Sequence, residues 1–94
     1  MAPHFRIIFT KAFERTLKKL SKKNPEVAEV YESMLRTLES DPLNISRRHQ
    51  IKKLTDVDAG DGRWRIRSGD YRLRYDVHNQ MVVLHSIRRR DKAY

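Results

Sequence analysis

Residues 63–77 read RWRIRSGDYRLRYDV, and their alternation is the basis for predicting the sheet. From residue 63 to residue 67 every second residue is an arginine, with Trp64 and Ile66 between them. After a Ser-Gly-Asp turn, arginines alternate again, now with tyrosine and leucine. Because residues i and i+2 of a strand share a face, the pattern predicts a β-hairpin with one apolar face and one face of guanidinium groups.

The guanidinium face carries more like charge than folding calls for, since like charges opposite each other destabilise a sheet. The net charge of the chain is +9, and residues 47–94 hold 13 basic and 6 acidic side chains, against 8 and 6 in residues 1–46. Such an uneven charge favours RNA as the partner. A solvated surface, or a docking surface for an acidic protein segment, is the alternative interpretation.

Length and composition exclude several classes of protein. Ninety-four residues predict one domain, residues 1–94. The absence of cysteine excludes disulfides and cysteine-based metal or redox chemistry. Without a run of about 18 apolar residues or a signal-peptide pattern, we expect a cytoplasmic protein with no membrane partner. Carboxylates and histidines lack metal-ligand spacing, so we predict no metal and no cofactor.

The first half of the chain predicts one strand and two helices. Residues 4–9 (HFRIIF) alternate as a strand, and Thr10 is a plausible cap for a helix that ends near Ser21. Asn24-Pro25 then predicts the start of a second helix, whose apolar stripe runs from Val27 to Leu38. Asp41-Pro42 should end it, so the two helices form an antiparallel hairpin.

The second half of the chain predicts a β-meander. Residues 43–50 and 56–62 have the composition of loops, and the expected strands are 51–54, 63–67, 71–77 and 81–87. The fold class is therefore α+β: an N-terminal strand, a helical hairpin and a mostly antiparallel sheet. The helices should cover one face of the sheet and leave the arginines on the other.

Three arginines and a tyrosine are the candidate catalytic residues: Arg65, Arg72, Arg90 and Tyr94. Guanidinium groups bind phosphate bidentately and stay charged, and two or three on one phosphate could stabilise a pentacoordinate transition state. Tyr94 supplies a stacking ring and a phenol. RNA carries its own nucleophile, the 2′-OH, so cleavage needs no metal.

Other aromatic and histidine side chains have structural interpretations. Trp64, Tyr71 and Tyr75 alternate with the arginines, so we expect them in the core rather than under a base. His85 lies in an apolar strand and is interpreted as a structural histidine.

The order of these motifs resembles the RelE/ParE superfamily of type II toxins over essentially the whole chain. Residues 63–75 look like its "basic-x-basic-x-R-x-G-x-YR-x-x-Y" hairpin, and residues 89–94 (RRDKAY) look like its terminal "HR-x-x-x-Y" signature. The resemblance implies a bacterial or archaeal toxin with a microbial-RNase-like fold, held inactive by a cognate antitoxin encoded beside it.

Toxins of the RelE branch enter the ribosomal A site and cut mRNA there by 2′-OH attack, which leaves a cyclic phosphate. The resemblance thus implies an mRNA endoribonuclease that inhibits translation. By position, Arg63 and Arg65 fall on strand residues that handle proton transfer and phosphate, and Arg72 on the arginine at the scissile phosphate. Arg90 falls on a transition-state stabiliser, and Tyr94 on the tyrosine that stacks on a base and orients the 2′-OH. The basic residues expected to bind RNA are Arg63, Arg67, Arg74, Arg89 and Lys53.

Three departures from the family pattern affect this expectation. Some relatives have lysine at the position of Arg65, and a guanidinium cannot lose its proton as an amine can. The general base is therefore open among His85, Tyr94 and a group of the ribosome. Arg89 replaces a common histidine, and the α-carboxylate of Tyr94 is expected to temper the site beside Arg90.

Other functions remain open at this stage. A ParE-like inhibitor of gyrase belongs to the same superfamily, but such members generally lack the full arginine and tyrosine set. A non-catalytic RNA- or ribosome-binding module, as a decayed toxin would be, is the second alternative. A ribosome-independent ribonuclease is the third, and the lack of an obvious strong base disfavours it.

Overall fold

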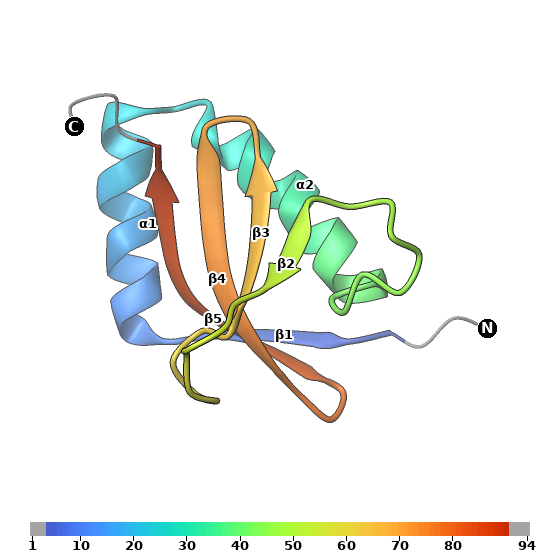
Figure 1. The fold of residues 1–94 in the computed structure, drawn as a ribbon. Coiled ribbons are helices and arrows are strands. Elements are labelled where there is room, and N and C mark those ends of the chain that lie inside the picture. Colours follow the sequence, from blue (N-terminus) through green and yellow to red (C-terminus); the bar gives the residue numbers. More distant parts are fainter. Residues whose placement is uncertain (1–3, 91–94) are drawn as a thin grey trace.

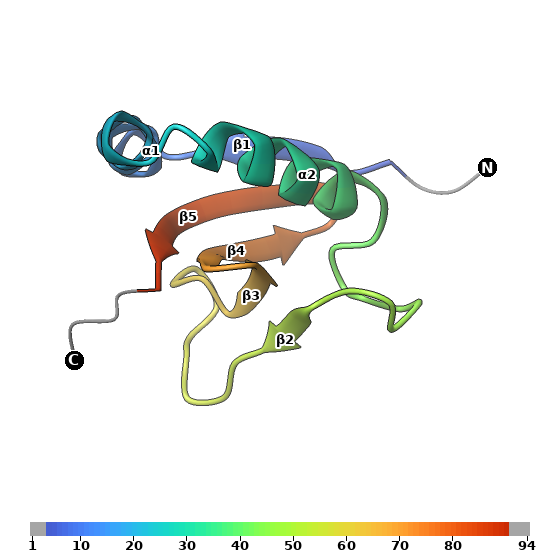
Figure 2. The same cartoon turned by 90° about the horizontal axis from the view of Figure 1, so that it is seen from above.

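The structure is a computed structural model that describes residues 4–90. It contains one five-stranded sheet with both helices packed on the same side (Figures 1 and 2). The elements are β1 (Arg6–Phe9), α1 (Lys11–Lys23), α2 (Val27–Ser40), β2 (Ile51–Lys53), β3 (Trp64–Ser68), β4 (Tyr71–His78) and β5 (Met81–Arg89). Within residues 4–90, no helix has the length and apolar character needed to cross a membrane.

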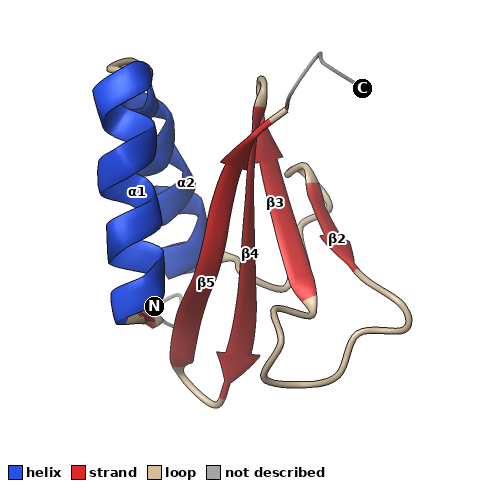
Figure 3. Cartoon of the chain, turned by 90° about the vertical axis from the view of Figure 1, so that its left-hand side faces the viewer, coloured by secondary structure: helices blue, strands red, loops and turns tan. Residues whose placement is uncertain are grey.

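The strand order is β1-β5-β4-β3-β2. Strands β2 to β5 form an antiparallel meander, and β1 pairs with β5 in parallel, so the first strand of the chain lies beside the last. Figure 3 shows the helices on one side of this sheet and the opposite side free of them. The predicted α+β fold is confirmed, whereas the parallel pairing of β1 was not foreseen.

The helices are defined by their caps. The Thr10 hydroxyl accepts a hydrogen bond from the Phe13 amide at 3.0 Å, as predicted. The prediction that the second helix starts at Asn24-Pro25 is wrong by two residues. Asn24 is the C-cap of α1, with its amide donating to the Leu20 carbonyl, and its own carbonyl accepts from Val27 in a turn.

The core lies between the helices and the inner face of the sheet. Tyr71, Leu73 and Tyr75 of β4 are at most 3% exposed, which confirms that these two tyrosines are structural. Trp64 is partly buried and packs against the same cluster. The fully buried core residues are Phe13, Val27, Met34, Leu38, Ile66, Tyr71, Leu73, Tyr75, Val82, Leu84 and Ile87.

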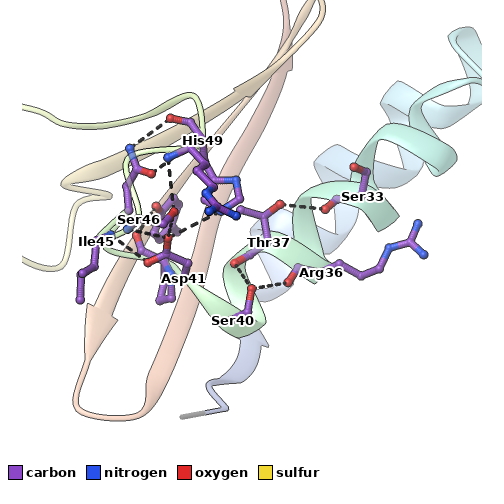
Figure 4. A network of polar contacts seen from close by, with 12 residues as sticks. Ser33, Arg36, Thr37, Ser40, Asp41, Ile45, Ser46 and His49 are labelled. Carbon is purple, nitrogen blue, oxygen red and sulfur yellow. Dashed lines mark hydrogen bonds and ion pairs between the residues drawn. The ribbon is translucent and has the colours of Figure 1, made fainter. Parts of the chain in front are cut away.

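The loop between α2 and β2 is held by its own hydrogen bonds (Figure 4). The Asp41 carboxylate accepts from the Ile45 amide at 2.8 Å and from the hydroxyl and amide of Ser46 at 2.6 and 3.2 Å. The side chain of Asn44 bonds the backbone of His49 in both directions. This loop leads directly into β2, so it fixes where that edge strand meets the sheet.

Candidate nucleic-acid interface

The outer side of the sheet, away from the helices, carries two rows of basic residues. Strand register places Lys52, Arg65, Arg74 and Ser86 in one row across β2 to β5. The next row contains Arg67, Arg72 and Arg88. We refer to Lys52, Arg65, Arg67, Arg72, Arg74 and Arg88 as the arginine face. The predicted division of the hairpin into an apolar and a guanidinium face is confirmed by this register.

A pocket of about 260 Å³ opens on the arginine face and is lined by Leu54, Arg65, Arg72, Arg74, Ser86 and Arg88. We refer to it as the arginine pocket. The Nε atoms of Arg65 and Arg72 are buried and have no hydrogen-bond acceptor within residues 4–90. Burying a polar atom without a hydrogen-bond partner costs free energy, so the burial of these two Nε atoms requires an explanation. An anion seated between these two guanidinium groups would supply the missing acceptors.

Two of the predicted RNA-binding arginines hold the fold instead of pointing freely outward. Arg74 donates through Nε to the Gly62 carbonyl at 3.0 Å and through Nη2 to the Asp61 carbonyl at 2.9 Å. Arg63 donates through Nε to the Val57 carbonyl at 3.1 Å. Both side chains therefore tie the loop of residues 55–62 to the sheet. Arg74 also lines the arginine pocket, but its guanidinium is already hydrogen-bonded to carbonyls of the loop.

The glycine at position 62 lets this loop approach the sheet closely. Its φ is +78°, a conformation that other residues rarely adopt. A Cβ there would lie 3.1 Å from the Cβ of Arg74 and 3.6 Å from that of His85. The loop thus covers part of the outer face next to the arginine pocket.

Other predicted site residues lie elsewhere. Lys53 pairs with Trp64 in register, and its Nζ lies 5.7 Å from the centre of the Trp64 ring, so it is on the helix side of the sheet. Arg89 also turns to that side: its Nη2 is 4.0 Å from Asp70, opposite Tyr71 in the register. Arg67 is exposed on the arginine face, 3.5 Å from the Gln50 amide oxygen.

Arg90 follows the end of β5 and is exposed, and its amide donates to the Asp70 carbonyl. It lines a second cavity, of about 410 Å³, between α1 and β5, together with Lys19, Lys23, Arg88 and Arg89. Since Arg88 lines both cavities, Arg90 lies near the arginine pocket without forming its wall. Tyr94 is outside the described residues.

Two basic residues of the arginine face were missed by sequence reasoning, namely Lys52 and Arg88. Arg88 was hidden by a β-bulge: Arg74 pairs with Ser86 but Tyr75 pairs with Leu84, so the alternation of β5 shifts at His85. Two polar residues between the apolar Leu84 and Ile87 were the available sign of this shift. For Lys52, the register of the short strand β2 decides the face, and the sequence there is too short to fix it.

Within residues 4–90, no group of three or more carboxylates and histidines is close enough together to hold a metal ion. The arginine face is instead a cationic surface. A carboxylate and an imidazole lie beside it, and the Asp76 Oδ2 and His85 Nε2 atoms are 2.7 Å apart.

Comparisons with known proteins identify the family and the fold. The family model for the ParE toxin of the type II toxin–antitoxin system parDE matches residues 7–94. Among curated proteins there is no match. The structure resembles a chain of the toxin–antitoxin complex RelBE2 from Mycobacterium tuberculosis, with a TM-score of 0.71, 28% identity, and coverage of 93% of this chain and 99% of that one.

Two archaeal structures share the fold at lower identity. One is the RelE–RelB complex from Pyrococcus horikoshii, with a TM-score of 0.61, 21% identity, and coverage of 96% of this chain and 99% of that one. The other is the RelB–RelE complex from Methanococcus jannaschii, with a TM-score of 0.59, 22% identity, and coverage of 88% of this chain and 89% of that one. The family match spans nearly the whole chain, and the fold and motif order agree with it. This protein belongs to the RelE/ParE superfamily of type II toxins.

Proposed function

We propose that this toxin is a metal-independent endoribonuclease that cuts mRNA in the ribosomal A site and so inhibits translation in the cytoplasm. Many toxins of this superfamily are ribosome-dependent ribonucleases. The observation that carries the proposal is the pair of buried, unpartnered Nε atoms of Arg65 and Arg72 on one pocket. Two such donors suit a phosphate that gains negative charge in the transition state.

The proposed roles follow from position. Arg65 and Arg72 bind the scissile phosphate and stabilise the charge that develops on it when the 2′-OH attacks. Arg67, Arg88 and Lys52 hold neighbouring phosphates on the exposed rows of the arginine face. Arg90 reaches the same phosphate from the end of β5, and Tyr94 remains the proposed stacking residue. The ribosome supplies the orientation of the mRNA, which a shallow open face cannot supply alone.

The proposed protein partner is an acidic antitoxin segment. Each of the three solved structures described above is a toxin–antitoxin complex. In this chain the 410 Å³ cavity has an apolar floor of Leu20 and Ile87, and basic residues of α1 and β5 surround it. This combination fits a segment that carries both apolar and acidic side chains and folds on binding.

The test is inducible expression of the toxin without its antitoxin, followed by primer extension on a defined mRNA. The wild type should arrest growth and produce new in-frame cuts, and the antitoxin gene supplied in trans should restore growth. Arg72→Ala should reduce cutting by about 10²–10³-fold, as removal of an oxyanion donor does. Because the Arg72 Nε has no partner within residues 4–90, this substitution breaks no hydrogen bond of that atom.

The matched control is Arg36→Ala, which removes an exposed arginine from α2, on the helix side of the sheet. It should cut like the wild type, and equal loss in both variants would contradict the assignment to Arg72. The match to the ParE model favours gyrase inhibition as the second candidate. Growth arrest without mRNA cuts, together with inhibited DNA supercoiling, would establish that second function and reject the first.

A further inference from the structure

The bulge in β5 brings a histidine to the arginine face. His85 has no cross-strand partner, because Arg74 pairs with Ser86 and Tyr75 pairs with Leu84. Regular alternation would turn His85 and Ser86 to opposite sides of the sheet. The bulge leaves both between the core residues Leu84 and Ile87, on the outer side. Ser86 and Arg74 line the arginine pocket. His85 is not itself a lining residue, but its Cβ lies beside Gly62 next to that of Arg74: a Cβ on Gly62 would be 3.6 Å from the former and 3.1 Å from the latter.

Asp76 holds the ring of His85 in place. Its Oδ2 is 2.7 Å from the His85 Nε2, and its two oxygens also accept from the amides of Gly62 at 2.9 Å and Arg63 at 3.0 Å. Burial opposes ionisation of Asp76, but the hydrogen bonds from Arg63, Gly62 and His85 outweigh it and lower its pKa. An ionised Asp76 has no proton to donate, so it accepts the Nε2–H of the imidazole, and in the neutral imidazole this leaves the lone pair on Nδ1.

The other charged groups on the elements packed around Asp76 and His85 either form hydrogen bonds with the 55–62 loop or lie farther along the chain. Arg74 of β4 and Arg63 before β3 donate to carbonyls of the 55–62 loop. Asp61 of that loop contributes its carbonyl to Arg74. On the far side of β5, β1 ends at Phe9 opposite Leu84, and Lys11 is the first residue of α1. Asp76 is thus the charged group in contact with the imidazole.

The residues that line the arginine pocket include no ready proton acceptor: four are arginines, and the others are Leu54 and Ser86. Attack by the 2′-OH needs an acceptor, and arginine stays protonated at physiological pH. We propose that His85 accepts the proton of the attacking 2′-OH through Nδ1, with Asp76 as its positioning residue. This inference rests on the proposed ribonuclease function.

The step balances as follows in atoms and electrons. The 2′-oxygen gives its proton to Nδ1 and forms a bond to phosphorus, while the bond from phosphorus to the 5′-oxygen breaks. The leaving 5′-oxygen takes a proton from water, and the hydroxide that remains takes the proton of the imidazolium, which restores neutral His85. The products are a 2′,3′-cyclic phosphate and a 5′-hydroxyl. Asp76 stabilises the imidazolium that forms, as the carboxylate does in a Ser-His-Asp triad.

The test measures single-turnover cutting of a defined mRNA on purified ribosomes between pH 5.5 and 8.5. The wild-type rate should rise with pH, because Nδ1 can accept a proton only when the imidazole is neutral. His85→Gln keeps an N–H for Asp76 but loses the basic nitrogen that can take up the proton, so it should cut about 10²–10⁴-fold more slowly with a flattened pH profile. Asp76→Asn should lose less rate and displace the profile. His78→Gln, at the exposed end of β4, is the control and should match the wild type.

Two further arms separate catalysis from folding and base from acid. Should His85→Gln unfold, His85→Ala with added imidazole should recover pH-dependent cutting, and no recovery in folded protein would overturn the proposal. An mRNA with sulfur at the leaving 5′ position needs no proton there. Recovery of His85→Gln activity on that mRNA would make His85 a proton donor and would also overturn it.

The outcomes also distinguish failure of the His85 proposal from failure of the proposed ribonuclease function. A wild type that cuts, beside a His85→Gln variant with the same rate and pH profile, rejects the role of His85 and keeps the ribonuclease. A folded wild type that makes no cut under any condition rejects both.

Discussion

At the scale of single residues, the arginine pocket keeps two donors without acceptors. Leaving a buried donor unpaired costs about 1–3 kcal/mol, yet the Nε atoms of both Arg65 and Arg72 are in this state within residues 4–90. Arg63 and Arg74, on the same hairpin, show that loop carbonyls can satisfy guanidinium groups there. The contrast supports different roles for the two pairs: Arg63 and Arg74 stabilise the structure around the site, and the other pair binds the ligand.

Tyr75 gives the residue-scale stability prediction. It is fully buried, and its hydroxyl donates to the Pro42 carbonyl at 2.6 Å, which joins β4 to the end of α2. Burial raises the pKa of Tyr75 far above the usual tyrosine range, so the hydroxyl stays a donor. Tyr75→Phe should lower the free energy of unfolding by about 1–3 kcal/mol, because the carbonyl is left unsatisfied.

Urea unfolding at neutral pH measures this effect. Tyr31→Phe is the control, since the half-buried Tyr31 ring packs against Phe13 with centroids 5.9 Å apart and phenylalanine keeps that packing. A Tyr75→Phe variant as stable as Tyr31→Phe would mean that the bond to Pro42 contributes nothing.

Single residues also show which side-chain positions could be predicted from the sequence. Alternation correctly separated Tyr71 and Tyr75 from the arginines, because strand geometry has a period of two. It misplaced Lys53 and overlooked Lys52, since three residues of β2 contain too little pattern to fix their register. Arg63 and Arg74 donate hydrogen bonds to carbonyls of the 55–62 loop. These are tertiary contacts, so no local sequence pattern predicts them.

At the scale of elements, the bulge in β5 has the largest consequence for the site. It resets the strand so that Ile87 joins the core and Arg88 joins the arginine face. Counting by twos from Leu84 would have sent both residues to the wrong side. The sequence therefore predicted every strand and both helices to within a few residues, but it did not show that Arg88 lies on the arginine face and Arg89 on the other, because one inserted residue reverses the facing of all that follow.

The loop of residues 41–50 carries the element-scale prediction. Partial burial opposes ionisation of Asp41, but the Ser46 hydroxyl and the amides of Ile45 and Ser46 outweigh it and lower its pKa. A carboxyl whose folded pKa is depressed contributes stability above its unfolded pKa, about 3.9, and loses it as pH falls through the folded value. Asp41→Asn should thus be less stable than the wild type at pH 7, with the difference closing below about pH 4.

Urea midpoints measured from pH 7 down to pH 2.5 check this. Ser46→Ala removes the 2.6 Å hydroxyl bond to Asp41 and the 3.3 Å bond that the Arg48 amide donates to the same hydroxyl. Only the first depends on the charge of Asp41, so the pH-dependent part of the gap should be smaller than for Asp41→Asn. A gap that persists unchanged at pH 2.5 would assign the effect to something other than the charge of Asp41.

At the scale of the whole molecule, charge is sorted between the two sides of β5. Arg88 faces the open side of the sheet, and Arg89 faces Asp70 and Tyr71, whose hydroxyl donates to Glu26 at 2.7 Å. The Tyr71 hydroxyl lowers the pKa of Glu26, so this side of the molecule keeps a carboxylate near Arg89. The net charge of +9 is therefore not spread evenly, and the side without helices is the one that suits a polyanion.

This sorting predicts different salt dependences for two adjacent arginines. Each phosphate contact on single-stranded RNA contributes about 0.7 to the slope of log K against log salt. Arg88→Ala should reduce the slope for binding a short single-stranded RNA by about that amount. Arg89→Ala should leave it nearly unchanged, because its guanidinium lies on the helix side beside Asp70. Binding titrations between 50 mM and 500 mM salt separate the two, and equal loss of slope in both variants would place the RNA around the end of β5 instead of across the arginine face.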